Sequence, residues 1–168
     1  MLAHATNVIA EGAVLQLLNM HAPAVSAARP LPVIRSKTAK LFEAAAHLGA
    51  LIAGAPDAAI DAAAEYGRSL GTAFQLVDDV LDYSGNAADI GKNVGDDLRE
   101  GKPTLPLIYL MENGSAEQRT LVRACIENGD EQHFDDILAA ITSSGALDYT
   151  KHKAEKAAQR AAASIAGL

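Results

Sequence analysis

Residues 57–83 read DAAIDAAAEYGRSLGTAFQLVDDVLDY, and this stretch decides the class of fold. Its apolar and small side chains recur every three to four positions, which is the spacing of one face of an α-helix. The positions with this spacing are Ile60, Ala64, Gly67, Leu70, Gly71, Phe74 and Val77. We expect Asp57 to cap a long helix that ends at about Tyr83. The two glycines four residues apart indicate that another helix or a ligand approaches this face closely.

The rest of the chain shows helical spacing in shorter stretches, which proline and glycine separate. The expected helices cover 3–19, 33–53, 116–128, 131–142 and 147–165, and one more runs through Leu107, Ile108 and Leu110. A loop is expected at 84–92 and a short acidic turn at 96–100. Apolar residues make up 49% of the chain and aromatic residues 4%, which favours closely packed helices over strands. We predict an all-α fold that forms a single domain over residues 1–168.

Charge and composition exclude several classes of protein. The net charge of -7 argues against a nucleic-acid-binding module, because such modules carry a basic face. The single cysteine, Cys125, excludes an intrachain disulfide, and its amphipathic surroundings predict a buried thiol. The sequence shows no signal-peptide pattern and no apolar stretch near the roughly 20 residues that span a bilayer. We therefore expect a cytoplasmic protein without a transmembrane segment.

Three aspartates gather near the end of the long helix. Gln75, Asp78 and Asp82 are expected to share one helix face, and Asp79 flanks it. Carboxylate oxygens favour Mg²⁺ or Ca²⁺, and Mg²⁺ usually binds through one or two carboxylates together with substrate phosphates. A solvated acidic face is the alternative. The apolar residues interleaved with the acids predict a buried helix, where unpaired charge is unfavourable, so we favour a metal site.

Basic residues lie where a diphosphate would require them. Lys37 precedes Thr38 on an expected helix, Lys92 follows the three aspartates in the loop, and Lys102 lies beyond the acidic turn. Each lysine alone is typical of a solvated surface. Together with the acids they predict an anion site, because an ammonium group is a useful point charge for phosphate.

Three motifs then occur in order: Phe74-Gln75-x-x-Asp78-Asp79-x-x-Asp82, Gly91-Lys92-Asn93-Val94-Gly95-Asp96-Asp97-Leu98, and Glu100-Gly101-Lys102-Pro103-Thr104-Leu105-Pro106. They resemble the second aspartate-rich region of the trans-type polyprenyl diphosphate synthases. The upstream motifs Glu11-Gly12-x-x-x-Gln16 and Lys37-Thr38-Ala39-Lys40-Leu41-Phe42 also match. The wording is nearest to the long-chain branch, which includes the octaprenyl diphosphate synthases. The resemblance is strong over residues 1–111 and looser beyond.

This resemblance implies a helical bundle of the isoprenoid synthase type that condenses an allylic diphosphate with isopentenyl diphosphate. It implies Mg²⁺ as the cofactor, with Asp78 as a direct ligand and with Asp79 and Asp82 as direct or water-mediated ligands. The residues that it implies for substrate binding are Lys37, Thr38, Gln75, Lys92 and Lys102. Of these, the three with an implied catalytic role are Lys37, Thr38 and Gln75. A homo-oligomer, or pairing with a complementary chain, is the implied assembly.

The family's first aspartate-rich motif, its Gly-Lys-x-x-Arg isopentenyl-binding segment and its paired arginines do not occur before Glu11. We therefore expect the C-terminal part of the fold without its N-terminal helices, with exposed apolar surface and impaired or absent condensation activity when alone. A non-catalytic subunit that binds diphosphate and Mg²⁺ is one alternative. A helical scaffold whose acids have lost their role is another.

Overall fold

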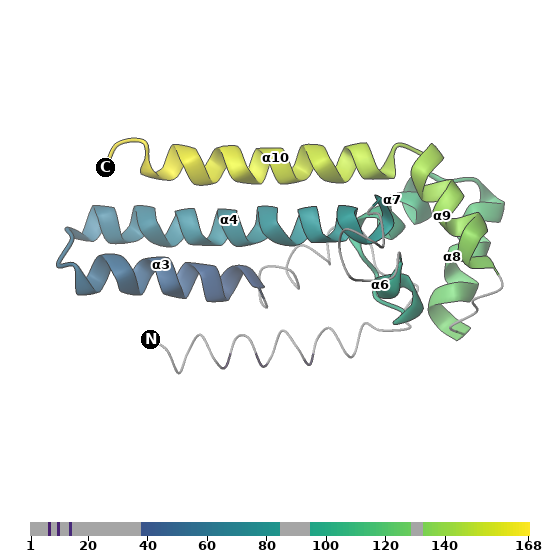
Figure 1. Ribbon diagram of the computed structural model, residues 1–168, viewed down its shortest axis with the longest axis horizontal. Helices are drawn as coiled ribbons and strands as arrows, with labels where there is room; N and C mark the ends of the chain where they lie inside the picture. The colour runs from purple at the N-terminus through teal and green to yellow at the C-terminus, as the bar shows by residue number, and fades with distance from the viewer. Residues whose placement is uncertain (1–6, 8–9, 11–13, 15–37, 85–94, 129–132) are drawn as a thin grey trace. The chain divides into compact units, whose positions relative to one another are not determined.

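The computed structural model describes residues 38–84, 95–128 and 133–168, together with Asn7, Ala10 and Val14 (Figure 1). Its helices are α3 (Lys40–Ile52), α4 (Asp57–Ser84), α6 (Asp96–Arg99), α7 (Leu105–Asn113), α8 (Ala116–Asn128), α9 (Phe134–Ser143) and α10 (Ala146–Ile165). No strand occurs within these described ranges. The predicted all-α class is confirmed.

The long helix α4 extends over the residues that its spacing predicts, but its first turn differs in one detail. The backbone N–H of Ile60 donates to the carbonyl of Pro56 at 3.0 Å, so Pro56 is the residue that begins the hydrogen-bonded helix. Asp57 lies in the first turn. The prediction that Asp57 is the N-cap is therefore wrong by one position, although its carboxylate still interacts favourably with the helix dipole.

The other predicted helices agree with the structure to within a few residues. Helix α8 has the predicted bounds, α9 ends one residue later than predicted, and α10 begins one residue earlier. Helix α3 begins at Lys40, after a wide π-type turn at Thr38 and Ala39. The helix predicted at 3–19 and the loop at 84–92 lie almost wholly outside the described residues.

The described chain divides into two compact units, and each is described by itself. Of the described residues, the first unit contains 38–75 and 152–168 with Asn7, Ala10 and Val14, and the second contains 76–84, 95–128 and 133–151. Helices α4 and α10 each pass from one unit to the other. The single domain over residues 1–168 stays a prediction.

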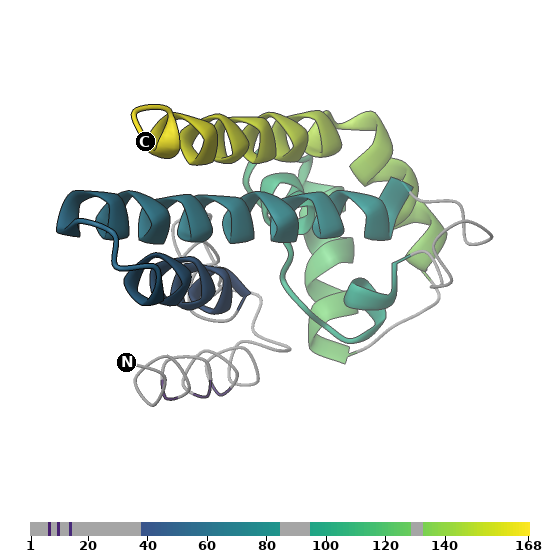
Figure 2. The ribbon, with the colours of Figure 1, turned by 60° about the vertical axis from the view of Figure 1, so that its left-hand side comes forward.

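In the first unit α3 packs directly against the glycine face of α4. A β-carbon on Gly71 would lie 2.7 Å from the Cα of Ala39, and one on Gly67 would lie 2.8 Å from the Cα of Glu43. The backbone of α3 therefore approaches both glycines closely, and the Phe42 side chain lies beside Gly71. The sequence predicted that the glycine pair marks the close approach of either a helix or a ligand. In the structure it is a helix, α3, that approaches. The C-terminal part of α10 runs alongside α4 in Figures 1 and 2, and its Ala154 and Ala161 are buried.

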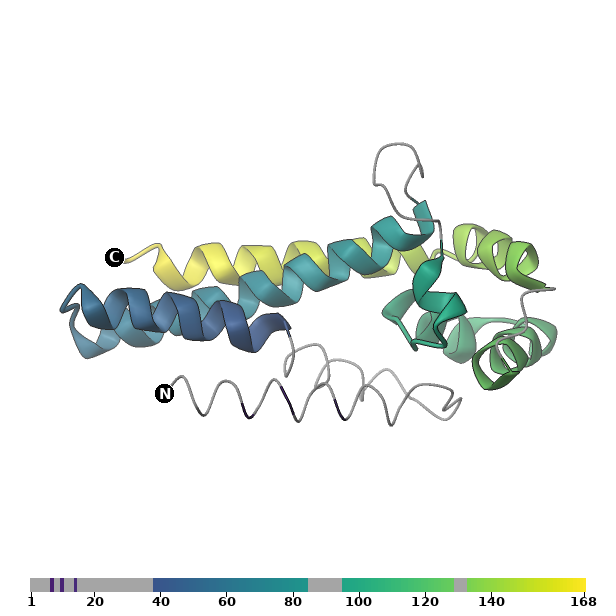
Figure 3. The same cartoon turned by 60° about the horizontal axis from the view of Figure 1, so that its bottom comes forward.

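The second unit has the larger apolar core. Helices α7, α8 and α9 pack on one another, and the short helix α6 lies against α8 (Figure 3). The core side chains are Tyr83, Leu98, Leu107, Leu110, Val122, Cys125, Ile126, Ile137, Ile141, Ala146 and Leu147. Cys125 is buried, as predicted. This core holds the end of α4 and the start of α6, the two segments that carry the acidic residues.

None of the helices described is both long enough and apolar enough to cross a membrane. The expected cytoplasmic location stays a prediction.

Candidate functional site

The end of α4 presents its three aspartates in two different environments. Asp79 is buried, with an exposed fraction of 3%, and shares the inward face of the helix with Leu76 and Tyr83. Asp78 and Asp82 are half-buried on the neighbouring face, as is Gln75 one turn earlier. The structure therefore agrees with the predicted division in which Asp79 lies beside the face that the other residues share.

The apolar residues interleaved with these acids are not all buried. Phe74, Val77 and Leu81 are 56%, 46% and 42% exposed. They lie three and four residues apart and so form one stripe along α4. The prediction that the helix is buried on its other apolar sides is wrong for this stripe. Phe74 contacts the Phe42 ring of α3, with ring centroids 5.7 Å apart, yet it remains more than half exposed.

The acidic turn folds back onto the end of α4. The backbone N–H of Gly95 donates to the carbonyl oxygen of Asp82 at 2.7 Å. The backbone N–H of Asp97 donates to the Asp82 carboxylate, Oδ2, at 3.3 Å. Gly95 has a φ of 76°, a left-handed conformation that favours glycine. This glycine turn brings the second pair of aspartates, Asp96 and Asp97, to the acids of α4.

The carboxylates are close enough to change one another's ionisation. Burial raises the pKa of Asp82 to about 6, and the negative charges of Asp97, Asp96 and Asp78 add to the rise, while the hydrogen bond from the Asp97 N–H opposes it. The ionised Asp82 is therefore disfavoured by its surroundings. A bound cation would reverse this effect, because an opposite charge within a few ångströms favours the ionised form.

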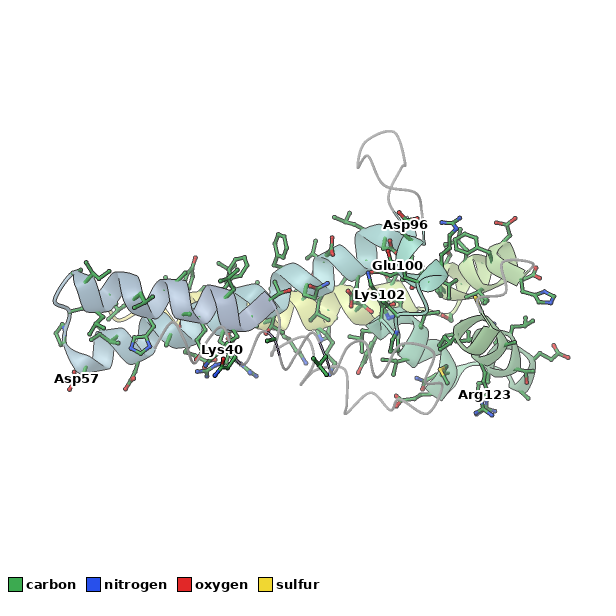
Figure 4. The ribbon with its side chains drawn as sticks, turned by 90° about the horizontal axis from the view of Figure 1, so that it is seen from below. Lys40, Asp57, Asp96, Glu100, Lys102 and Arg123 are labelled. Atoms are coloured by element: carbon green, nitrogen blue, oxygen red, sulfur yellow. The ribbon has the colours of Figure 1, made fainter. Side chains whose placement is uncertain are left out.

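Lys102 returns to this acidic group from the segment after α6. Its Nζ lies 2.9 Å from Asp97 Oδ1 and 2.6 Å from Glu100 Oε2, and Figure 4 shows it beside Glu100 and close to α6. Burial opposes the charged ammonium, but hydrogen bonds to Glu100 and Asp97 outweigh burial and raise the pKa of Lys102. Lys102 is thus paired with two acids of the expected acidic turn, Asp97 and Glu100.

A buried hydrogen bond ties the segment that carries Lys102 to α4. The hydroxyl groups of Tyr83 and Thr104 are 2.9 Å apart. Burial raises the pKa of Tyr83 well above its ordinary value, and the charges of Asp82, Asp97 and Asp79 contribute in the same direction. Neither residue stood among the candidate site residues. The signal for both was position, since Tyr83 directly follows Asp82 and Thr104 follows the Lys102-Pro103 dipeptide.

In the first unit, two of the predicted catalytic residues meet. The Thr38 hydroxyl donates to the side-chain carbonyl of Gln75, Oε1, at 2.9 Å. They are 37 residues apart in the chain, so the contact comes from the packing of the start of α3 against α4. Lys37 and Lys92, the remaining predicted substrate-binding residues, lie outside the described residues.

The chemistry of the donors in the second unit fits Mg²⁺. Asp78, Asp79 and Asp82 offer hard carboxylate oxygens, and the Asp82 carboxylate lies among like charges. Among the described residues, no group of three or more His, Cys, Asp or Glu side chains is arranged to hold an ion by itself. A Mg²⁺ ion that takes one or two protein carboxylates and completes its shell with water and phosphate fits both observations.

Residues 1–143 match the family model described as "Polyprenyl synthetase". The chain belongs to the polyprenyl synthetase family. The family model and the relatives both confirm the resemblance of the three motifs. The octaprenyl diphosphate synthase of Haemophilus influenzae is 52% identical over 165 residues, which cover 98% of this chain and 50% of the relative. The octaprenyl diphosphate synthase of Escherichia coli (strain K12) is 47% identical over 165 residues, 98% of this chain and 51% of the relative.

A solved structure agrees with the helical architecture. The crystal structure of polyprenyl synthase from Caulobacter crescentus CB15, complexed with calcium and isoprenyl diphosphate, has a TM-score of 0.92 and 44% sequence identity. The alignment covers 98% of this chain and 51% of that chain. This polyprenyl synthetase chain therefore has the isoprenoid synthase type of fold and spans about half the length of the relatives that it matches.

Proposed function

We propose that this chain carries the second aspartate-rich wall of a prenyltransferase site and binds the diphosphate of an allylic substrate through Mg²⁺. One observation supports this proposal above the others: the Gly95 turn folds back on α4, so that the Asp97 N–H donates to the Asp82 carboxylate. Asp82 of α4 and Asp97 of the acidic turn thereby lie close together, and Lys102 lies beside Asp97. Family membership supports the proposed substrate class, since the relatives named above are octaprenyl diphosphate synthases.

Asp78, Asp79 and Asp82 are the residues that would hold Mg²⁺, through one or two direct carboxylate contacts and through water. Bound Mg²⁺ supplies electrostatic stabilisation of the negative charge on the leaving diphosphate. Asp79 is the least accessible of the three, so we assign it to orienting the ligand set from the buried side. Asp78 and Asp82, which are half-buried, face the substrate.

The lysines bind the diphosphate oxygens directly. Lys102 donates to Asp97 and Glu100, and an ammonium group has three protons, so one remains for a phosphate oxygen. Lys37 and Lys92 are assigned to the same task from the family motifs alone. Gln75, whose side-chain carbonyl accepts from Thr38, is assigned to orienting the reacting centre, and Thr38 to a place beside the departing phosphate.

The full reaction that we propose for a prenyltransferase site of this family is the condensation of an allylic diphosphate with isopentenyl diphosphate to a longer polyprenyl diphosphate. The isopentenyl-binding segment and the first aspartate-rich motif do not occur in these 168 residues. We therefore propose that the 168 residues alone bind the allylic diphosphate with Mg²⁺ but form little or no longer product.

Calorimetric titration of the chain with farnesyl diphosphate, with and without Mg²⁺, tests this function. Binding is expected only with Mg²⁺, and Asp78→Ala or Lys37→Ala should weaken it at least tenfold, since each removes a charged contact worth about 1.5–3 kcal/mol. Asp61→Ala is the matched control, because Asp61 is an exposed aspartate on the same helix. Binding that is unchanged in both site variants would sink the proposal. A product assay with added isopentenyl diphosphate measures turnover separately.

The exposed stripe of Phe74, Val77 and Leu81 favours a second candidate, a binding subunit that pairs with a complementary chain. Under this candidate, product formation appears only when the chain is mixed with a chain that carries the first aspartate-rich motif. Mixing without any gain in product would count against it.

A further inference from the structure

Arg99 and Phe134, which the proposed function does not use, also contact the Gly95 turn and the acidic residues that follow it. Arg99, the last residue of α6, places its guanidinium carbon 4.1 Å from the centroid of the Phe134 ring. The same guanidinium lies 3.3 Å from Asp96 Oδ1. A cation over the face of an aromatic ring is attracted by the ring's quadrupole. The ring and the carboxylate together fix the direction of the Arg99 side chain.

The Phe134 ring also lies against Gly95. A β-carbon on Gly95 would lie 2.6 Å from Cε2 of the ring and closer still to Cζ. The ring therefore fills the space in which any other residue would place its side chain. Since Gly95 also needs its positive φ, the turn accepts Phe134 only because position 95 is glycine.

Phe134 differs from its neighbours on α9. Ile137 and Ile141 are 1% and 0% exposed and belong to the apolar core of the second unit. Phe134 is half-buried at the edge of that core, where α9 begins. The isoleucines anchor the helix, whereas the phenylalanine is the residue that meets the acidic turn.

These contacts reach Asp82 through the backbone. Phe134 presses on Gly95, whose N–H donates to the Asp82 carbonyl, and Asp97 donates to the Asp82 carboxylate two residues later. We propose, resting on the function proposed above, that Phe134 and Arg99 are positioning residues. They hold the Gly95 turn against α4, and the Asp97 N–H then keeps the Asp82 carboxylate in position to take Mg²⁺ with the diphosphate.

Two substitutions of Phe134 separate positioning from packing. Phe134→Leu removes the ring and with it both the face under Arg99 and the edge against Gly95. Phe134→Tyr keeps the ring face but adds a hydroxyl at Cζ, the ring atom nearest to Gly95, and so pushes the turn away. Leu138→Ala is the matched control, because Leu138 lies one turn further along α9 and packs on the same core.

The first readout is amide hydrogen exchange at Gly95 and Asp97, measured by NMR on the full chain without metal. The second is the Mg²⁺-dependent affinity for farnesyl diphosphate. Both Phe134 variants are expected to lose protection at the two amides and to bind about three- to tenfold more weakly. Leu138→Ala should lower the overall stability of the chain. It should leave two quantities unchanged: the affinity for farnesyl diphosphate, and the protection of the Gly95 and Asp97 amides compared with that of core amides.

The possible results distinguish this inference from the proposed function. Unchanged protection in both Phe134 variants would show that Phe134 does not hold the Gly95 turn in place. Lost protection with wild-type affinity would show that holding the turn does not contribute to binding. Either result overturns this inference and leaves the proposed function standing. If the wild-type chain binds no farnesyl diphosphate with Mg²⁺, the proposed function fails and the positioning role fails with it. Hydrogen exchange still shows in that case whether Phe134 holds the Gly95 turn in place.

Discussion

Replacement of Asp82 by asparagine should stabilise the metal-free chain at neutral pH, although it removes a proposed Mg²⁺ ligand. In the folded chain the pKa of Asp82 is raised to about 6 from an ordinary 3.8, by burial and by the charges of Asp97, Asp96 and Asp78. Ionised Asp82 therefore opposes folding. Asparagine carries no charge and keeps a side-chain oxygen that accepts from the Asp97 N–H.

The size and pH window of the effect follow from the two pKa values. The difference between about 6 and 3.8 corresponds to about 3 kcal/mol, which partial exposure of the side chain lowers to about 1–2 kcal/mol. Because the folded-state pKa is the higher one, the wild type keeps full stability below about pH 4 and loses this amount as pH rises to 6 and beyond. The advantage of Asp82→Asn should therefore be complete at pH 7–8 and absent near pH 4.

Urea unfolding in EDTA at pH 4, 6 and 8 measures this advantage directly. Asp61→Asn, on an exposed position of the same helix, is the control and should show no comparable gain. In Mg²⁺ with farnesyl diphosphate the order should reverse, because only the wild type gains the binding free energy. A variant that is less stable than the wild type at pH 8, or equally favoured at pH 4 and pH 8, would refute the reasoning.

Three further substitutions test the packing that supports the site, each by urea or thermal unfolding. Gly67→Ala should lower the free energy of unfolding by about 1–3 kcal/mol, because its methyl group would lie 2.7 Å from the Phe42 carbonyl carbon. Gly49→Ala, on α3 with open space around it, is the control and should leave the free energy of unfolding unchanged or raise it by up to about 1 kcal/mol. Tyr83→Phe should cost about 1–3 kcal/mol by leaving the buried Thr104 hydroxyl without the Tyr83 hydroxyl, and no loss would show that water replaces it. Ile126→Ala, in a fully buried position, should cost about 2–5 kcal/mol, and a smaller cost would mean that the core of α7, α8 and α9 closes around the cavity.

The helices were predictable from the sequence because their evidence is local. The three-to-four-residue spacing defines α4 and α8, and glycines or prolines mark most of the ends. The cap of α4 was misplaced because an aspartate at the first helical residue and one at the cap have the same sequence signature. Only the hydrogen bond from Ile60 to Pro56 distinguishes them.

The candidate site was predictable only in part. Spacing shows which residues share a face of α4, but it does not show whether another element covers that face, so the exposure of Phe74, Val77 and Leu81 was missed. The motifs placed Asp97 and Lys102 in order along the chain. Their contacts with Asp82 and Glu100 depend on how the chain turns at Gly95 and after α6.

The contact between Gly95 and Phe134 had no signal in the sequence. The two residues are far apart in the chain, and a phenylalanine that begins an amphipathic helix predicts burial rather than a particular neighbour. A contact of this kind follows from tertiary packing alone.

The close approach of the α3 backbone to the glycines of α4 has a consequence for how the sequence can vary. In a library selected only for abundance of folded chain, Gly67 should tolerate almost no replacement, because every other residue carries the β-carbon that meets α3. Asp82 should accept neutral replacements in the same library and lose that tolerance once Mg²⁺-dependent binding of farnesyl diphosphate is selected. Comparing the two selections would separate the positions that folding restricts from those that ligand binding restricts.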